Sequence, residues 1–470
     1  MTTDAASTGW RALFAPAWIP AIAVMLGGIL LHSMNVLMMA TVLPSIVGEI
    51  GGAVLMSWPT TAYLASSIIA ATCTGLLAAA LGTGRTFALG AGIFAIGTLV
   101  IGFAPAMAHV IAGRLIQGLG GGLLSALAYV LVRQVFPSSL WARAFALLSS
   151  IWGISVLVGP LVGGVFADSG RWRGAFLAIA ALAVSLALLA LWTLPRTAKN
   201  EAAAAGVPLG RVALICLAIA AMSLAAVADT PPSKAAMIAA AAAAFAVALW
   251  TDRRSRSRLL PSDAFSPRTP TGIGLWMVLL LSIAYTPMSI FGPLFLQHIH
   301  GLSPLAAGYT VATSSMGWTI VSVLIAAAGA VWSSRLIVLG PLTTMLGLLG
   351  VGALMPTGPF AALVLAISLI GTGAGFCWAF IAQRTMAGAR PGDEDAAAGA
   401  VATVQQVGMA FGAAIAGLVA NVIGFAGGLQ HQAILDAARW VPTSFALAAL
   451  IVCALGLMLN RIARRAPGGL

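Results

Sequence analysis

The chain has 470 residues, of which 61% are hydrophobic and only 7% are charged, and its mean hydropathy is +1.04. A soluble domain carries about 25% charged residues, so this composition excludes a soluble enzyme and favours a protein that spans a membrane. The net charge of +12 does not indicate nucleic-acid binding, because the basic residues lie at the ends of apolar runs and form no stripe.

Fourteen apolar segments are long enough to cross a bilayer, which takes about 20 residues as a helix. Their apolarity is continuous rather than alternating, which favours helices over the strands of a closed barrel. The first segment is longer than a signal-peptide core and lacks a convincing cleavage site, so we expect it to remain as a membrane helix. The expected spans lie near residues 18–47, 54–78, 86–106, 108–132, 143–167, 174–194, 209–228, 233–251, 271–296, 304–330, 335–355, 359–383, 396–424 and 440–460.

The distribution of basic residues predicts the orientation of the chain. With the N-terminus inside, 18 of the 23 Lys and Arg residues fall on the inner side and 4 fall outside, while Arg114 lies within a span. Inner loops of membrane proteins carry this excess of positive charge. We therefore expect a multi-pass protein of the cell (inner) membrane with both termini in the cytoplasm.

Two polar stretches, at residues 195–210 and 251–271, interrupt the succession of spans and bracket the seventh and eighth. The second contains the basic run from Asp252 to Arg258, which we interpret as a solvated loop facing the membrane surface. The interruptions predict three parts. These are a six-helix bundle at 1–196, an inserted helix pair with cytoplasmic linkers at 197–270, and a second six-helix bundle at 271–470.

An internal repeat supports two related bundles. One arginine and three glycines, spaced by five, seven and five residues, occur in both halves of the chain. They are Arg85, Gly90, Gly97 and Gly102 in the first half and Arg335, Gly340, Gly347 and Gly352 in the second. Such repeats are typical of transporters whose substrate path lies between the repeated units near the bilayer midplane.

The most specific motif lies in the fifth span, where residues 153–164 read GISVLVGPLVGG. Pro160 lacks a backbone donor and bends a helix, and the glycines around it allow another helix to approach closely. This segment resembles the antiporter motif of the major facilitator superfamily, and within it of the fourteen-helix drug:proton antiporter family. The resemblance gives a conformational role to Gly153, Gly159, Pro160, Gly163 and Gly164.

The resemblance extends over nearly the whole chain. Further matching pieces are Ala40–Pro44 in the first span, Arg114, Gln117, Gly118 and Gly120 in the fourth, and Gln405, Gln406, Gly408 and Gly412 in the thirteenth. The loop after the second span keeps the family's Gly75, Gly82 and Arg85. The resemblance implies an all-α polytopic membrane protein, with two major-facilitator-type six-helix bundles plus two inserted helices, that exports small amphipathic molecules.

Two departures from the family concern proton coupling. Asn35 stands where the family has an aspartate in the first span, and Ala79 replaces the aspartate that helps to latch the cytoplasmic side. All eleven carboxylates fall in termini, loops or the ends of spans. A buried carboxylate is the usual proton carrier, so its absence leaves open whether protons are coupled.

Candidate substrate-binding residues are the polar and aromatic side chains within the spans. Arg114 is either a structural group bonded to polar neighbours or the contact for an anionic or polar substrate. His32 shares a helix face with Asn35 and is either a structural donor or a proton carrier. The full set is His32, Asn35, Tyr63, Arg114, Gln117, Trp152, Tyr285, Trp378 and Gln405.

Several functions remain as alternatives to efflux. One is a facilitator or exchanger for an anionic metabolite that uses Arg114, and another is a non-transporting membrane sensor or assembly protein. An enzyme would need a nucleophile with a base, paired acids or a metal cluster at membrane depth, and the sequence offers none. We expect no cofactor, no metal and no nucleic acid, but a monomer in membrane lipid that binds a small-molecule substrate and, where coupling survives, protons.

Overall fold

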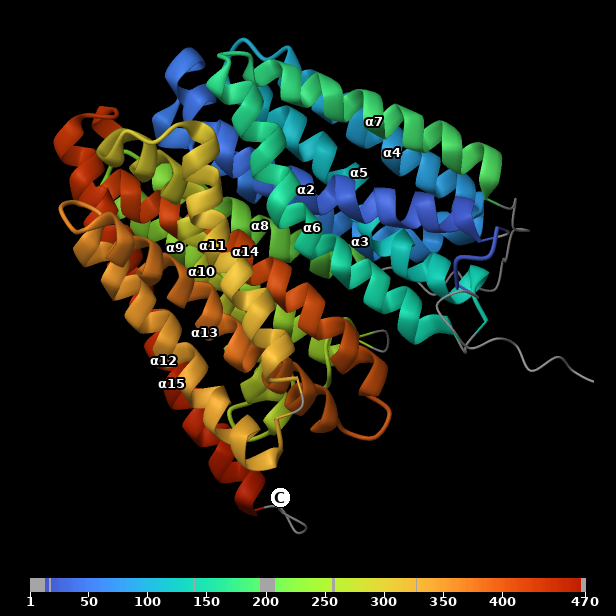
Figure 1. The fold of residues 1–470 in the computed structure, drawn as a ribbon. Helices are drawn as coiled ribbons and strands as arrows, with labels where there is room; N and C mark the ends of the chain where they lie inside the picture. Colours follow the sequence, from blue (N-terminus) through green and yellow to red (C-terminus); the bar gives the residue numbers. More distant parts are fainter. Residues whose placement is uncertain are drawn as a thin grey trace, which may run out of the picture. The chain divides into compact units, whose positions relative to one another are not determined.

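The computed structural model describes residues 13–16, 18–137, 140–194, 208–255, 258–326 and 328–465. This part of the chain forms fourteen long α-helices and two short 3-10 helices (Figure 1), and each predicted span falls on one of the long helices. The long helices are α2 (Ile19–Ile50), α3 (Trp58–Leu81), α4 (Thr83–Gly102), α5 (Met107–Val135), α6 (Trp141–Asp168), α7 (Trp172–Thr193), α8 (Leu209–Val227), α9 (Pro231–Arg254), α10 (Pro270–His300), α11 (Pro304–Leu324), α12 (Ala330–Leu354), α13 (Phe360–Ala387), α14 (Glu394–Ile423) and α15 (His431–Arg465). The 3-10 helices are η1 (Ala53–Leu55) and η4 (Phe425–Gly427).

Thirteen of the helices in the described ranges are long and apolar enough to cross a membrane, and α11 is the one predicted span that does not reach this apolarity. The reason is its content of serine and threonine. Hydroxyl groups on α11 donate to carbonyl oxygens of their own helix, as Thr310 does to Ala306 at 2.8 Å and Thr319 to Ser315 at 3.0 Å. A helix can therefore carry these polar groups without leaving them unpaired.

The chain divides into two compact units, each built from helices of one half with a small exchange near the start. Among the described residues, unit 1 holds those up to Met39 and those from Ser66 to Leu194. Unit 2 holds Ala40–Ala65 and the residues from Pro208 onward. The predicted boundary at 196/197 lies outside the described residues, and the three-part division stays a prediction.

The glycine repeat occupies equivalent contacts in the two units. In unit 1, a Cβ atom added at Gly97 on α4 would lie 2.6 Å from the Gly113 carbonyl oxygen on α5. In unit 2, a Cβ atom at Gly340 on α12 would lie 2.6 Å from the Gly373 carbonyl oxygen on α13. Both helix pairs approach backbone to backbone, which only small residues allow.

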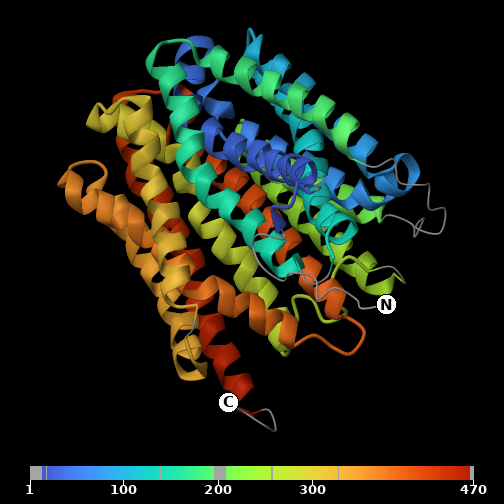
Figure 2. The ribbon, with the colours of Figure 1, turned by 45° about the vertical axis from the view of Figure 1, so that its right-hand side comes forward.

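The last glycine of each repeat contacts a third helix of its unit, and the two contacts are again equivalent. Gly102 on α4 lies against Leu177 of α7, and Gly352 on α12 lies against Arg439 and Thr443 of α15. In unit 1, α4 therefore packs on both α5 and α7, and in unit 2, α12 packs on both α13 and α15 (Figure 1, Figure 2). The repeat read from the sequence is confirmed as a repeat of packing.

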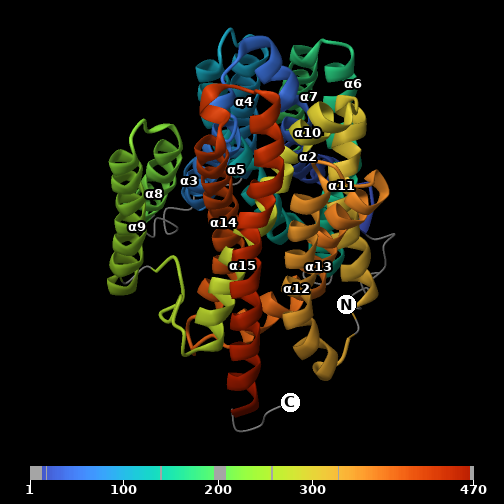
Figure 3. The same cartoon turned by 90° about the vertical axis from the view of Figure 1, so that its left-hand side faces the viewer.

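The inserted helices α8 and α9 form a hairpin (Figure 3) and belong to unit 2. α8 packs on α14, where the buried side chain of Asn421 donates to the carbonyl oxygens of Val54 and Ala226, both at 2.9 Å. One side chain thus ties α14 to η1 and to the end of α8. α9 packs mainly on α8, with the Phe245 ring 5.7 Å from that of Phe411 on α14.

We predict that Gly97→Ala destabilises the protein, whereas Gly92→Ala on the same helix does not. The added methyl group at Gly97 meets the backbone of α5, and overpacking of this kind costs about 1–3 kcal/mol. Nothing lies within 4 Å of a Cβ atom at Gly92. Thermal unfolding in detergent measures the difference, and equal melting temperatures for the two variants would show that α4 and α5 do not approach at Gly97.

Candidate functional site

A buried polar network in unit 1 joins α2, α4 and α5, with Gln117 at its centre. The Gln117 Oε1 atom accepts from Arg114 Nη1 at 2.7 Å and from Asn35 Nδ2 at 3.1 Å. Its Nε2 atom donates to Asn35 Oδ1 at 3.2 Å and to Thr98 Oγ1 at 2.8 Å. The structure thus brings together three of the predicted site residues and adds Thr98.

His32 lies one turn before Asn35 on α2 and belongs to the same region. Its imidazole hydrogen-bonds to the backbone of Gly121 on α5. Its ring centroid lies 6.1 Å from that of Trp152 on α6, in an edge-on arrangement. His32 is buried and Trp152 is 43% exposed. The four predicted residues of α2 and α5, with Trp152 beside them, therefore gather within unit 1.

The glycine motif of α6 packs on α2 at the level of this network. A Cβ atom at Gly159 would lie 2.7 Å from Leu37 Cβ, while nothing lies within 4 Å of one at Gly153. The hydroxyl groups of Ser155 and Ser33 hydrogen-bond at 2.5 Å across the same contact. Pro160, Gly163 and Gly164 are buried. The conformational role of these residues stays a prediction, but the close approach that it requires is present at Gly159.

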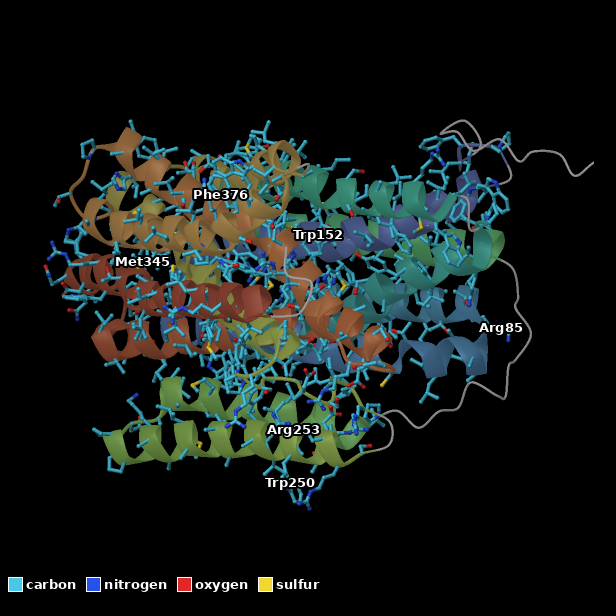
Figure 4. The ribbon with its side chains drawn as sticks, turned by 90° about the horizontal axis from the view of Figure 1, so that it is seen from below. Arg85, Trp152, Trp250, Arg253, Met345 and Phe376 are labelled. Atoms are coloured by element: carbon cyan, nitrogen blue, oxygen red, sulfur yellow. The ribbon has the colours of Figure 1, made fainter. Side chains whose placement is uncertain are left out.

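The other predicted conformational residues lie at or near the turn between α3 and α4. Gly75 is within the last two turns of α3, Gly82 is between the helices, and Arg85 is in the first turn of α4. Gly82 precedes α4 with a φ of 83°, a left-handed value that favours glycine. Gly75 and Arg85 are both exposed, and Arg85 is labelled in Figure 4. The Thr86 hydroxyl donates to the Leu77 carbonyl oxygen at 2.9 Å and holds the turn closed.

An aromatic cluster in unit 2 combines four helices. The Tyr285 ring on α10 lies 5.5 Å from the Trp318 ring on α11, which lies 5.5 Å from the Trp378 ring on α13. Gln405 Nε2 on α14 donates to the Tyr285 hydroxyl oxygen at 3.3 Å. Three residues of the cluster were predicted and Trp318 was not, because a single tryptophan in a span is most often a packing residue.

Tyr63 is the predicted site residue that belongs to neither group by the contacts described above. It lies on α3, in the part of that helix that belongs to unit 2, and its side chain is fully buried. Its assignment to a substrate cavity therefore remains a prediction from the sequence.

The acidic residues of the described ranges all lie in loops or near helix ends. Glu49, Asp168 and Asp252 fall within the last three residues of their helices, and Asp436 is the sixth residue of α15. Asp4 and Glu201 lie outside the described residues. Within the described part of the chain, no three His, Cys, Asp or Glu side chains gather as metal ligands would. The polar network of unit 1 thus consists of Arg114 and neutral side chains.

The family model of the Major Facilitator Superfamily matches residues 25–413 of this chain. A probable multidrug-efflux transporter of Mycobacterium tuberculosis (strain CDC 1551 / Oshkosh) is 35% identical to it over 440 residues, which cover 90% of this chain and 92% of that protein. The chain belongs to the major facilitator superfamily. With thirteen candidate spans in its described ranges, this member of the superfamily is a multi-pass membrane protein, and the placement of its termini in the cytoplasm stays a prediction.

Solved structures agree with the superfamily fold. A peptide transporter of the POT family aligns with a TM-score of 0.66 at 14% identity, covering 94% of this chain and 95% of that one. A human organic anion transporter aligns with a TM-score of 0.59 at 16% identity, covering 94% of this chain and 100% of that one. At these identities the likeness concerns the fold alone.

We predict that Gln117→Ala lowers the free energy of unfolding by about 1–3 kcal/mol, because it removes a hydrogen-bond partner from buried groups on three helices. Ser125→Ala is the matched control, since the Ser125 hydroxyl donates within α5, to the Gly122 carbonyl oxygen. We expect this control to stay within about 0.5 kcal/mol of the parent protein. A Gln117→Ala protein as stable as the control in chemical unfolding would contradict a structural network.

Proposed function

We propose that the chain is a multidrug efflux transporter, which exports small amphipathic molecules by alternating access of two helix bundles. The observation that carries this proposal is the relative named as a probable multidrug-efflux transporter, because the 35% identity extends over 90% of this chain and 92% of the relative. The motif of α6 and the packing repeat of α4 and α12 support it.

The aromatic cluster of unit 2 is the proposed binding surface for the apolar part of the substrate. Tyr285, Trp318 and Trp378 offer ring faces and edges that attract planar molecules of varied shape. The Tyr285 hydroxyl and the Gln405 amide add hydrogen-bonding groups beside the rings. Contacts of this type tolerate many substrates, as a multidrug transporter requires.

The charges within the spans favour neutral or anionic substrates over cations. Among the described residues, the acidic ones stay near helix ends, while Arg114 is buried in the network of unit 1. A cationic compound would find ring faces but no buried carboxylate as a partner. Arg114, always protonated, suits a carboxylate or another anionic group.

Proton coupling, if the transporter uses it, requires a group other than a carboxylate within the spans. His32 is the proposed carrier, because an imidazole can gain and lose a proton and this one lies in the polar region of α2, α5 and α6. Coupling through His32 would replace the aspartate route of the antiporter family, which Asn35 does not provide.

The test is efflux of fluorescent aromatic compounds from a bacterial strain that lacks its own pumps, with and without a protonophore. We expect efflux of neutral and anionic compounds, and a loss of about tenfold or more in Trp318→Ala, which removes the middle ring of the cluster. Trp332→Ala is the control, because Trp332 is an exposed residue of α12 outside the cluster.

Each outcome of this test has a separate meaning. Efflux that stops with the protonophore and in His32→Ala supports coupling through His32. Efflux of anions alone, insensitive to the protonophore and lost in Arg114→Ala, would favour a facilitator or exchanger for an anionic metabolite. No flux of any compound from cells that contain the folded protein would contradict a transporter of this class.

We also predict that Asn35→Asp affects the efflux of anionic compounds but not that of neutral ones. The new carboxylate would lie beside Gln117 and near Arg114, and would neutralise the guanidinium. Efflux of anionic compounds should then fall by about tenfold, while efflux of neutral ones is retained. Asn35→Leu is the control for a loss of hydrogen bonds alone, and equal losses for neutral and anionic compounds in Asn35→Asp would show that the residue acts only through structure.

A further inference from the structure

At the end of α9, the described arginines of the run 252–258 are exposed, whereas the acidic residue of the run, Asp252, is buried. Asp252 is only 4% exposed. Its Oδ1 atom accepts from Arg211 Nη1 at 2.5 Å and from the Leu259 amide at 2.8 Å, and its Oδ2 atom accepts from the Leu260 amide at 3.0 Å. The carboxylate therefore joins the start of α8, the end of α9 and the following loop, and its charge is compensated inside the protein.

The two arginines that follow Asp252 have other partners. The Arg254 guanidinium lies 4.1 Å from the centroid of the Trp250 ring, one helical turn earlier on α9. Arg253 is exposed and its Nη2 atom donates to the Ala264 carbonyl oxygen at 2.8 Å, which holds the loop back against the helix. The described arginines of the run thus remain at the surface, while its one acidic residue, Asp252, is buried.

A third arginine of the run, Arg258, lies in the loop that follows α9. Arg258 Nη1 lies 3.9 Å from Asp393 Oδ1, at the limit of an ion pair, and the Arg258 side chain is 38% exposed. Asp393 is already engaged by Ser262, whose hydroxyl and amide hydrogen-bond to the carboxylate and lower its pKa. A pair at this distance, whose arginine remains partly in solvent, compensates only part of the charge of Arg258.

The position of this surface follows from the exposure of α9. Ile238, Val247 and Trp250 are exposed apolar residues of this helix, and Figure 4 shows the Trp250 ring on the side that faces away from α8. Such side chains on a spanning helix contact lipid, and tryptophan collects at the depth of the headgroups. Because Arg254 lies over the Trp250 ring, its guanidinium is placed at the same depth.

We propose that Trp250, Arg253, Arg254 and Arg258 form a binding site for the headgroup of an anionic phospholipid of the surrounding bilayer, which anchors the inserted helix pair. Guanidinium groups match phosphate oxygens in charge and geometry. The indole N–H of Trp250 supplies a hydrogen-bond donor, and its ring orients the guanidinium of Arg254. The predicted orientation places this site in the cytoplasmic leaflet, where basic clusters attract anionic lipids. The proposal does not depend on what the protein transports.

The experiment uses the full chain in phosphatidylcholine nanodiscs, with and without phosphatidylglycerol, and measures retained lipid by native mass spectrometry. We expect the parent protein to retain phosphatidylglycerol in preference to phosphatidylcholine. Arg254→Gln and Arg258→Gln should each weaken this retention by about fivefold. Both positions are at the surface, so the variants are expected to fold, and a melting curve checks this.

The matched control is Arg335→Gln. The Arg335 guanidinium lies 5.3 Å from the ring centroid of Trp332, which is 55% exposed on α12, so the pair resembles Arg254 and Trp250 without the adjacent arginines. An unchanged lipid preference in Arg335→Gln supports the proposal. An equal loss in Arg335→Gln and Arg254→Gln, unchanged retention in the double variant at 254 and 258, or displacement of the lipid by inorganic phosphate alone would each overturn it.

Discussion

The close approach of helix backbones at glycines is the constraint on which the rest of this structure depends. Helices in a bilayer gain little from moving apolar side chains out of lipid, so the distance between them is decided by what their surfaces allow. At Gly97 and Gly340, the space that a Cβ atom would occupy is taken by the facing helix. The two bundles therefore solve the same packing problem at equivalent points of α4 and α12.

The polar network of unit 1 is a consequence of this approach. Thr98 follows Gly97 on α4, and the contact of Gly97 with α5 brings its hydroxyl within 2.8 Å of the Gln117 amide. Gly159 brings α6 onto α2 in the same manner, beside the bond between Ser155 and Ser33. Buried polar groups are costly in an apolar medium unless their partners lie at bonding distance. The glycines supply that proximity.

Much of the fold could be predicted from the sequence because lipid imposes simple rules. Apolar length located all fourteen helices, and the spacing of glycines identified the repeat before its contacts were visible. α11 is the least apolar of them because of its serine and threonine residues, whose hydroxyl groups bond to their own helix. Trp318 was missed because contacts across helices decide its role, and a single sequence does not state that α10, α11 and α13 bring three rings together.

The two units differ in chemistry although they share a packing plan. In unit 1, the Gln117 amide makes four hydrogen bonds to Asn35, Thr98 and Arg114 in a buried setting, an arrangement that resists rearrangement. In unit 2, the Trp318 and Trp378 side chains are only half-buried, and ring contacts have no single required geometry. We infer that breadth of recognition belongs to unit 2 and discrimination of charge to unit 1. A repeat that preserves close helix contacts leaves the side chains beside them free to diverge in this way.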